Sequence, residues 1–294
     1  MKILVLGGSG FIGSNLCKSL LYQGNTVYCL DDFSTSSKNN VINFTKNENF
    51  HLINHDIRKE INISDINQIY NLASPAAPDH YRKDPLKTLE TNIYGTRNAL
   101  ELATKLDIPI MHSSTVRVFE YDHTGINSCY TEGKRVAETL CSEYRKKFST
   151  KVKISRLKSI YGPNMAVGDS RVIPQFIMKS LKNEDLIIFG DGNQIDSFCY
   201  IDDFLDVFIK FMNTETTETV LNIGNQTLTS IKELANTTLK VIKTNSKIIF
   251  KENGKNFESV NIDFKKSSDI LSWTPVTILE EGLRKTAEYY KKLI

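Results

Sequence analysis

The sequence predicts an α/β fold: a doubly wound parallel sheet of the Rossmann type, followed by a smaller C-terminal α/β lobe for a substrate. Three observations support this prediction. Short apolar strands alternate with longer helical patterns in the first half, a glycine-rich turn follows the first strand, and the pattern changes after Gly162-Pro163. The 294 residues are 40% hydrophobic and 24% charged, which suffices for one large α/β unit or two smaller ones.

The first half carries the pattern of successive βαβ units. Its strands are short apolar runs, and its helices are longer segments with helical spacing. The strands are predicted at 2–6, 26–30, 50–54, 68–72, 109–113 and 152–157, and the helices at 14–23, 85–106 and 132–148. Strands this apolar are typical of a parallel sheet that helices cover on both faces.

The second half has the pattern of a smaller α/β lobe. Helices are predicted at 172–181, 202–212, 231–241 and 279–292, and strands at 186–189 and 220–223. We therefore expect a nucleotide-binding domain over residues 1–164 and a substrate-binding lobe over residues 165–294. The helix at 202–212 is expected to pack back on the first domain.

Composition excludes several classes of function. The 37 basic and 34 acidic side chains give a net charge of only +3, so bulk electrostatics do not indicate a nucleic-acid partner. The five cysteines are scattered without a CxxC pair, and the five histidines form no HExxH motif, so no metal site is predicted. The chain opens directly on a strand and has no apolar run long enough for a membrane helix. We expect a protein of the cytoplasm with reduced thiols.

Three glycines after the first strand form a candidate dinucleotide-binding turn. Gly7, Gly10 and Gly13 are spaced as GxxGxxG between a strand and a helix, where glycine allows a tight turn and a close approach to a pyrophosphate. Asp31 ends the next strand, where a carboxylate binds ribose hydroxyls and repels a 2′-phosphate, which favours NAD over NADP. The alternative is a tight structural turn without a ligand.

Tyr130 and Lys134 form a YxxxK pair whose side chains share one helix face. A nearby lysine lowers the pKa of a tyrosine, which can then take a proton from a substrate hydroxyl. Ser113, Ser114 and Thr115 end the preceding strand, at the edge where such sheets hold ligands. The alternative is that the pair lies on an ordinary solvated helix face.

With these motifs in place, the chain resembles the extended short-chain dehydrogenase/reductases, also described as the NAD-dependent epimerase/dehydratase family. The resemblance rests on GGSGFIGSNL, NHDI, NLASPAAP, PLKTLETNIYGT, SSTVRVF and CYTEGKRVAET, and continues through YGPNM, DSRVIPQFI, YIDDF and LSWTPVTILEEGL. Within that family, SPAAP and CYTEGKRVAET are similar to the UDP-glucuronate decarboxylases, which make UDP-xylose.

The resemblance implies a closed redox cycle on a UDP-sugar. NAD oxidises C4 of UDP-glucuronate, the β-keto acid loses CO2, and the 4-keto pentose is reduced again. It implies Tyr130 as the base, Lys134 as its partner and Thr115 as the hydroxyl that holds O4. It also implies a homodimer. The expected cofactor-binding residues are Gly7, Gly10, Phe11, Ile12, Gly13, Asp31, Asp32, Phe33, Asp56, Ile57, Leu72, Ala73, Ser74, Tyr130 and Lys134.

The expected sugar-diphosphate positions depart from the family. Arg117 stands where the family has a glutamate, Ser159 where it has an asparagine, and Asp196 and Val260 where it has arginines. An arginine beside a substrate carboxylate stabilises it and raises the barrier to CO2 loss. An alternative is that Arg117 and Asp196 form a solvated surface pair.

Other positions expected on the substrate side either match the family or could replace a charge that this chain lacks. Lys158 could restore charge beside Ser159, and Arg171 matches a family arginine. Lys87 and Asn92 match the segment between cofactor and substrate, but each could equally be a helix-surface or capping residue. The expected substrate-binding residues are Lys87, Asn92, Arg117, Ser159, Arg171 and Asp196.

Three hypotheses for function follow. The first is UDP-glucuronate decarboxylation. The second is a related NAD-dependent reaction on another nucleotide sugar, such as 4-epimerisation or release of a 4-keto product, which the altered charges favour. The third is a catalytically impaired NAD-binding homologue, against which the retained Tyr130 and Lys134 argue.

Overall fold

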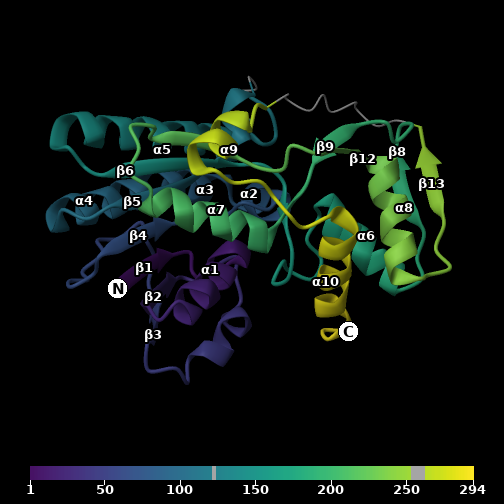
Figure 1. Cartoon of the computed structure of the whole chain (residues 1–294), viewed down its shortest axis with the longest axis horizontal. Coiled ribbons are helices and arrows are strands. Elements are labelled where there is room, and N and C mark those ends of the chain that lie inside the picture. The colour runs from purple at the N-terminus through teal and green to yellow at the C-terminus, as the bar shows by residue number, and fades with distance from the viewer. Residues whose placement is uncertain (121–123, 253–261) are drawn as a thin grey trace. The chain divides into compact units, whose positions relative to one another are not determined.

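The computed structural model describes residues 1–120, 124–252 and 262–294, and its elements follow the alternation expected in the first half (Figure 1). The strands are β1 (Lys2–Leu6), β2 (Thr26–Asp31), β3 (Phe50–Asn54), β4 (Gln68–Asn71), β5 (Ile110–Thr115), β6 (Val152–Leu157), β7 (Ile160–Tyr161), β8 (Leu186–Phe189), β9 (Ile195–Ser197), β10 (Cys199–Tyr200), β11 (Val220–Ile223), β12 (Leu228–Ser230) and β13 (Ile248–Lys251).

The α-helices are α1 (Phe11–Tyr22), α2 (Pro78–Lys83), α3 (Pro85–Glu90), α4 (Thr96–Leu106), α5 (Ser128–Phe148), α6 (Val172–Leu181), α7 (Ile201–Asn213), α8 (Ile231–Ile242), α9 (Lys265–Leu271) and α10 (Leu279–Lys291). The 3₁₀ turns are η1 (Lys38–Asn40), η2 (Ile42–Phe44) and η4 (Val116–Phe119), and η3 (Thr91–Gly95) is a π-helical turn.

A seven-stranded sheet with the order β11-β6-β5-β4-β1-β2-β3 confirms the predicted Rossmann-type fold. All pairings from β6 to β3 are parallel. The strand order reverses between β1 and β4, because β2 and β3 extend the sheet on one side while β5 and β6 extend it on the other. In sheets of this kind, ligands bind at the carboxyl ends of the strands beside such a reversal.

Helices cover both faces of this sheet, as the apolar strands predict. Ile69 and Ile154 face a core shared with α4 and α5. On the opposite face, the ring of Tyr70 lies 5.5 Å from the ring of Phe208 in α7, and Nζ of Lys153 donates to carbonyl oxygens at the end of the same helix. The alternation of β4 and β6 therefore places α7 and the α4–α5 pair on opposite faces.

The described chain forms two compact units. The first comprises Met1–Leu157 and Phe208–Leu221, and the second comprises Lys158–Val207 and Asn222–Ile294. Helix α7 belongs to both, because its residues from Phe208 pack in the first unit. The NAD-binding and substrate-binding roles expected for the two halves of the chain stay predictions.

The second unit contains three small two-stranded sheets. β10 pairs with β7 and β13 with β8 in parallel, and β12 pairs with β9 in antiparallel orientation. Its helices include α6, α8 and α10, which contact one another. All six strands have two to four residues. β8 has the predicted bounds 186–189, and the other five were not predicted, because a hydrophobic period hardly shows in so few residues.

The helix expected over 85–106 is interrupted by the π-turn η3. A Cβ atom at Gly95, the last residue of η3, would overlap the side chain of Ile57 in the loop after β3. At α5, a Cβ atom on Gly133 would lie 3.1 Å from Cβ of Asn92 in η3. Glycine at these two positions lets η3 approach both the β3 loop and helix α5 closely.

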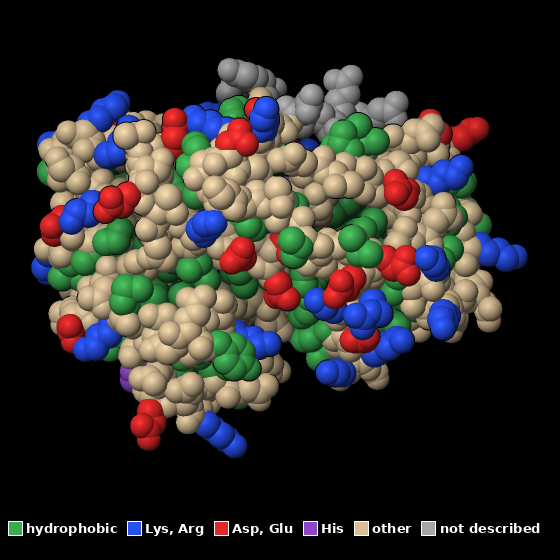
Figure 2. Space-filling model, viewed as in Figure 1, with side chains coloured by type: hydrophobic (Ala, Val, Ile, Leu, Met, Phe, Trp, Pro, Cys, Tyr) green, Lys and Arg blue, Asp and Glu red, His purple; other side chains and the backbone are tan. Residues whose placement is uncertain are grey.

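Charged side chains of both signs are interspersed on the face drawn in Figure 2, which agrees with the small net charge. Within residues 1–120, 124–252 and 262–294, none of the helices combines the length and the apolar character that crossing a membrane requires.

Candidate active site

The turn between β1 and α1 has backbone packing that suits a dinucleotide. Gly7 has a φ of +74°, and a Cβ atom there would lie 2.7 Å from Cα of Ala73 in the segment after β4. A Cβ atom at Gly13 would overlap the carbonyl oxygen of Gly7. Gly10, the N-cap residue of α1, has no side chain to cap the helix, so the positive end of α1 faces this turn.

We expect Gly13→Ala to lower NAD affinity by at least about tenfold and to cost about 1–3 kcal/mol of stability, because the added methyl group must displace the turn. Titration calorimetry with NAD and urea unfolding measure the two effects. Lys18→Ala, on the exposed face of the same helix, is the matched control. Full NAD affinity in Gly13→Ala would contradict a role for the turn in binding the cofactor.

Asp31 at the end of β2 is held by the turn itself. Its carboxylate accepts hydrogen bonds from the backbone N–H groups of Ser9 and Phe33, both at 2.9 Å, and from the hydroxyl of Ser36 at 2.8 Å. Its side chain is buried, while each carboxylate oxygen can accept more than one hydrogen bond. Asp31 is therefore fixed in orientation and still able to bind ribose hydroxyls.

A pocket within the first unit opens beside the turn and Asp31, with about 520 Å³ of space that includes open solvent. Its walls come from the carboxyl ends of β1 to β4 and from η3. They consist of Gly7, Gly10, Asp31, Asp32, Ser34, Thr35, Ser36, His55, Asp56, Ile57, Leu72, Ala73, Ser74, Pro75 and Thr91. Most residues expected to bind NAD are thus brought together here, and Phe11, Ile12 and Gly13 begin the helix behind the turn. The glycine packing and the acceptor Asp31 fit a dinucleotide.

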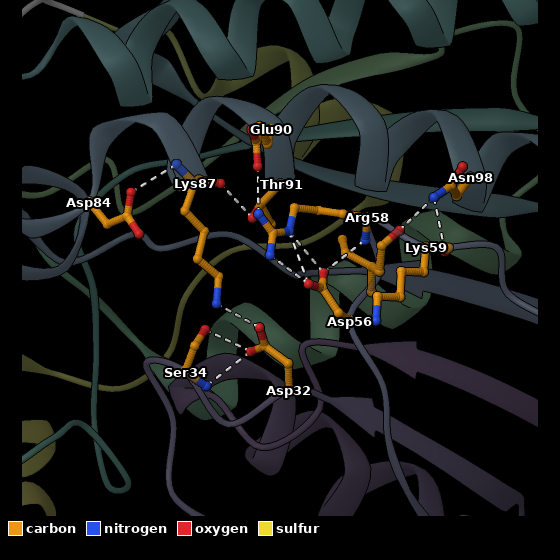
Figure 3. A network of polar contacts seen from close by, with 11 residues as sticks. Asp32, Ser34, Asp56, Arg58, Lys59, Asp84, Lys87, Glu90, Thr91 and Asn98 are labelled. Atoms are coloured by element: carbon orange, nitrogen blue, oxygen red, sulfur yellow. Dashed lines mark hydrogen bonds and ion pairs between the residues drawn. The ribbon is translucent and has the colours of Figure 1, made fainter.

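Charged side chains link two loops of this pocket to α3 (Figure 3). Nζ of Lys87 donates to Asp32 at 2.9 Å, and the backbone N–H and hydroxyl of Ser34 donate to the same carboxylate. Partial burial opposes ionisation of Asp32, but these hydrogen bonds prevail and keep its pKa below the usual value. Lys87 thus lies beside this pocket.

The second link runs through Arg58 in the loop after β3. Its guanidinium binds the carboxylate of Asp56 through two nitrogens, the shorter contact being 2.7 Å, and also pairs with Glu90 at the end of α3. Hydrogen bonds from Arg58 lower the pKa of Asp56. Asp56 is therefore an anion with its charge largely matched.

Tyr130 and Lys134 lie in the first two turns of α5. Nζ of Lys134 donates to the carbonyl oxygen of Ser113 in β5 at 2.7 Å, and the side chain is 2% exposed. Burial lowers the pKa of Lys134 to about 8. The ring of Tyr130 stacks on the ring of Tyr81 in α2, with 5.2 Å between centroids and 13° between planes. These contacts fix both side chains of the YxxxK pair.

Thr115, at the carboxyl end of β5, is the third expected catalytic residue. Its hydroxyl oxygen accepts a hydrogen bond from the backbone N–H of Arg117 at 3.2 Å, so its own proton can be donated to a substrate oxygen. Lys134 in α5 binds Ser113, which lies two residues before Thr115 in β5. The end of β5 and the start of α5 are therefore in contact. The structure thus brings the expected base, its lysine partner and the hydroxyl residue to one edge of the sheet.

Arg117 lies on η4 beside the tyrosine pair. Its NH1 group is 3.5 Å from the carboxylate of Glu120, and both side chains are more than a third exposed. Burial raises the pKa of Tyr81, and the positive charge of Arg117 opposes that rise. Arg135 in α5 donates to the carbonyl oxygens of Val118 and Glu120, which orders the turn that carries Arg117.

The expected substrate positions Ser159 and Asp196 are in contact within the second unit. The Ser159 hydroxyl donates to Asp196 at 2.8 Å, and Nζ of Lys158 lies 3.1 Å from the same carboxylate. The negative charge of Asp196 is therefore matched by Lys158. Arg171 binds Asp169 through two nitrogens, with Nε contacts of 2.9 and 3.1 Å.

Two further expected positions complete the comparison with the sequence. Asn92 is 1% exposed in η3, and its amide donates to the carbonyl oxygen of Thr88 at 2.9 Å. Val260 lies outside the described residues.

Sequence reasoning missed several side chains around the site. Tyr81 comes from the short helix α2, whose one signal is Pro78 at its first position, where proline is favoured. His112 is buried in β5, with Nδ1 3.3 Å from the amide of Asn71 in β4. Burial, reinforced by the charge of Lys134, lowers the pKa of His112. A single histidine in an apolar strand gave no signal for this pair.

Comparison with known proteins places this site in context. Residues 3–224 match the model of the NAD dependent epimerase/dehydratase family. UDP-glucuronic acid decarboxylase 1 of Xenopus tropicalis is 37% identical over 306 residues, covering 99% of this chain and 72% of that protein.

Two solved structures are similar over nearly the whole chain, and both are 4-epimerases. UDP-glucuronic acid 4-epimerase from Bacillus cereus, in complex with UDP-glucuronic acid and NAD, is 28% identical with a TM-score of 0.87, and all of both chains is covered. UDP-glucose 4-epimerase from Thermotoga maritima, with UDP-glucose, is 26% identical with a TM-score of 0.88, covering 100% of this chain and 99% of that one.

Proposed function

The chain belongs to the NAD-dependent epimerase/dehydratase family, and from this premise we propose that it converts UDP-glucuronate to UDP-xylose and CO2. It is an enzyme, and its cofactor is NAD. The observation that carries the decarboxylase proposal is similarity over 99% of the chain to a UDP-glucuronic acid decarboxylase, with Thr115, Tyr130 and Lys134 at one sheet edge. The roles of individual residues below belong to the proposal.

The pocket beside the glycine turn suits the adenosine half of the cofactor. Asp31 would accept the ribose hydroxyls, and the N-terminus of α1 would face the pyrophosphate. Bound NAD supplies a hydride acceptor that becomes a hydride donor later in the same cycle. Lys134 would bind the nicotinamide ribose beside Tyr130.

Proton transfer at the sugar falls to the YxxxK pair. Tyr130 takes the proton of the 4-hydroxyl group and returns it to O4 at the end of the cycle, so the enzyme emerges with its protons unchanged. Lys134, positively charged below about pH 8, favours the phenolate of Tyr130. Thr115 donates a hydrogen bond to O4 and holds it near the phenol. Loss of CO2 is driven by the carbonyl group at C4, which accepts the electron pair of the breaking C–C bond and becomes an enolate. C5 of this enolate then takes one proton from water, which restores the 4-keto group before C4 is reduced again.

A second function, 4-epimerisation of UDP-glucuronate, is favoured by Arg117. Its charge opposes the rise in the pKa of Tyr81, which stacks on Tyr130, and we infer that the guanidinium would pair with a carboxylate on the neighbouring sugar carbon. An arginine that binds this carboxylate stabilises it more than departing CO2 and slows decarboxylation. The similar Bacillus cereus enzyme is named a UDP-glucuronic acid 4-epimerase.

One product analysis separates these functions. Purified protein with NAD and UDP-glucuronate is followed by NMR in the anomeric region, together with CO2 release. We expect UDP-xylose and an equal amount of CO2. If the 4-epimer forms and no CO2 is released, the reaction is epimerisation and the decarboxylase proposal is wrong. If the protein binds NAD but forms neither product, both proposed reactions are contradicted.

We further propose a homodimer in the cytoplasm. Leu86 on α3, Tyr94 on η3 and Val136 on α5 are exposed apolar side chains on elements that contact one another, which suits an interface between copies of this chain. All five cysteines are free and buried, in keeping with a reducing compartment.

A further inference from the structure

Two ion pairs fasten helix α3 to the two loops that follow β2 and β3 (Figure 3). Lys87 reaches from α3 to Asp32 in the first loop, and Glu90 at the end of α3 pairs with Arg58 in the second. Ser34 and Asp56 fix the loop side of each pair, because Ser34 donates twice to Asp32 and Asp56 binds Arg58 through two nitrogens. We call the pairs Asp32–Lys87 and Arg58–Glu90 the clasp.

The clasp lies at the margin of the dinucleotide pocket. Asp32 and Asp56 line the pocket from the loops, and Thr91 lines it from the helical side. The hydroxyl of Thr91 donates to the carbonyl oxygen of Lys87 at 2.7 Å, so Lys87 is one helical turn from that wall. The ion pairs therefore connect opposite walls of the pocket.

The clasp has charge pairs that can open and close. The side chains of Lys87 and Asp32 are 25% and 27% exposed, and those of Arg58 and Glu90 are 29% and 47% exposed. Ion pairs that are this partly buried are ordered, but water still reaches them. Breaking one therefore does not leave an unsolvated charge in the protein interior. Their strength also falls as salt screens them.

We propose that the clasp controls how fast NAD enters and leaves, and that Lys87 acts as a positioning residue through Asp32. The inference rests on the proposed function, in which NAD is oxidised and reduced within one turnover and has no need to dissociate. Walls tied together by two ion pairs must separate before a dinucleotide held between them can leave. The clasp therefore slows both directions of exchange.

Stopped-flow fluorescence with NADH measures both rate constants without any sugar substrate. Lys87→Met and Asp32→Asn remove one partner each, and Arg97→Met removes the comparable exposed pair Arg97–Glu101 on α4 as a control. We expect both clasp variants to bind and release NADH about tenfold faster, because either change breaks the ion pair between Asp32 and Lys87. The double variant should be no faster than either single variant, since the pair is already broken. Arg97→Met should match the wild type.

Salt provides an independent readout. Release from the wild type should accelerate as sodium chloride rises from low to physiological concentration, and this dependence should be weaker in both clasp variants. Thermal unfolding of each variant confirms that the fold is intact.

The opposite pattern would overturn the clasp. If Lys87 contacts a phosphate of the dinucleotide directly, Lys87→Met slows association while Asp32→Asn leaves exchange unchanged or slower. Unaltered rates in both variants, or additive effects in the double variant, would equally refute the proposal. A wild type that binds no NADH at any concentration would instead contradict the proposed function.

Discussion

Tyr130→Phe is expected to lower kcat by about 10²–10⁴-fold, the range that a positioned proton-transfer group contributes. The phenylalanine ring keeps the stacking on Tyr81, whose centroid lies 5.2 Å from that of Tyr130, so the fold and the pocket remain intact. NAD affinity should change by less than about threefold, because the pocket beside Asp31 has none of its walls from Tyr130. Turnover of UDP-glucuronate and calorimetric titration with NAD measure the two quantities.

Tyr144→Phe is the matched control on the same helix. Its hydroxyl donates to Glu101 at an exposed position, so its removal should leave turnover near the wild-type value. Normal turnover in Tyr130→Phe would remove Tyr130 from the proton transfer. Loss of NAD binding along with turnover would instead indicate that Tyr130 serves to hold the cofactor.

Lys134→Met is expected to abolish turnover while stabilising the fold. Burial lowers the pKa of Lys134 to about 8, so the folded protein binds fewer protons than the unfolded chain between pH 8 and the ordinary lysine value near 10.5. The stability that depends on Lys134 therefore rises with pH through that window, and the buried charge costs most below pH 8.

This cost is about 3 kcal/mol at pH 7, from the difference between the two pKa values. The hydrogen bond from Lys134 to Ser113 offsets about 1 kcal/mol of it. We expect Lys134→Met to gain about 2 kcal/mol at pH 7 and little at pH 10, measured by urea unfolding. Lys147→Met, exposed on the same helix, should show no such dependence on pH. A large loss of stability at pH 7 would contradict the argument.

The rate of turnover is also expected to depend on pH, through the protonation of Lys134. Turnover of the wild type should decline as pH rises above about 8, because Lys134 then loses the proton that favours the Tyr130 phenolate.

The parts of the fold that depend on local pattern could be predicted from the sequence. The strands at 2–6, 50–54 and 152–157 have the predicted bounds, because each is a short apolar run between clear turns. The sequence predicts a continuous helix over 85–106, since a π-turn keeps helical spacing almost intact. Its interruption at η3 depends on how Gly95 packs against Ile57, 38 positions earlier in the chain, and no local pattern records that contact.

The same distinction applies to the candidate site. The YxxxK spacing and the glycine turn are local patterns, so they can be identified from the sequence alone. The structure adds the residues that surround them. The pair Asp32–Lys87 joins residues 55 positions apart, and Tyr81 stacks on a tyrosine from another helix. Such contacts depend on the tertiary arrangement, so the sequence predicts Lys87 between cofactor and substrate without indicating its pairing with Asp32.

The ion pairs of the second unit determine how an anionic substrate would approach. Lys158 is matched by Asp196 and Arg171 by Asp169, so these four side chains together carry no net charge. Long-range attraction speeds the encounter of a ligand with a protein only where the receiving surface has an excess of opposite charge. These two ion pairs would thus add no long-range attraction for an anionic nucleotide sugar, and their contribution to its association rate would change little with ionic strength. Discrimination among nucleotide sugars would then fall to short-range contacts made after arrival.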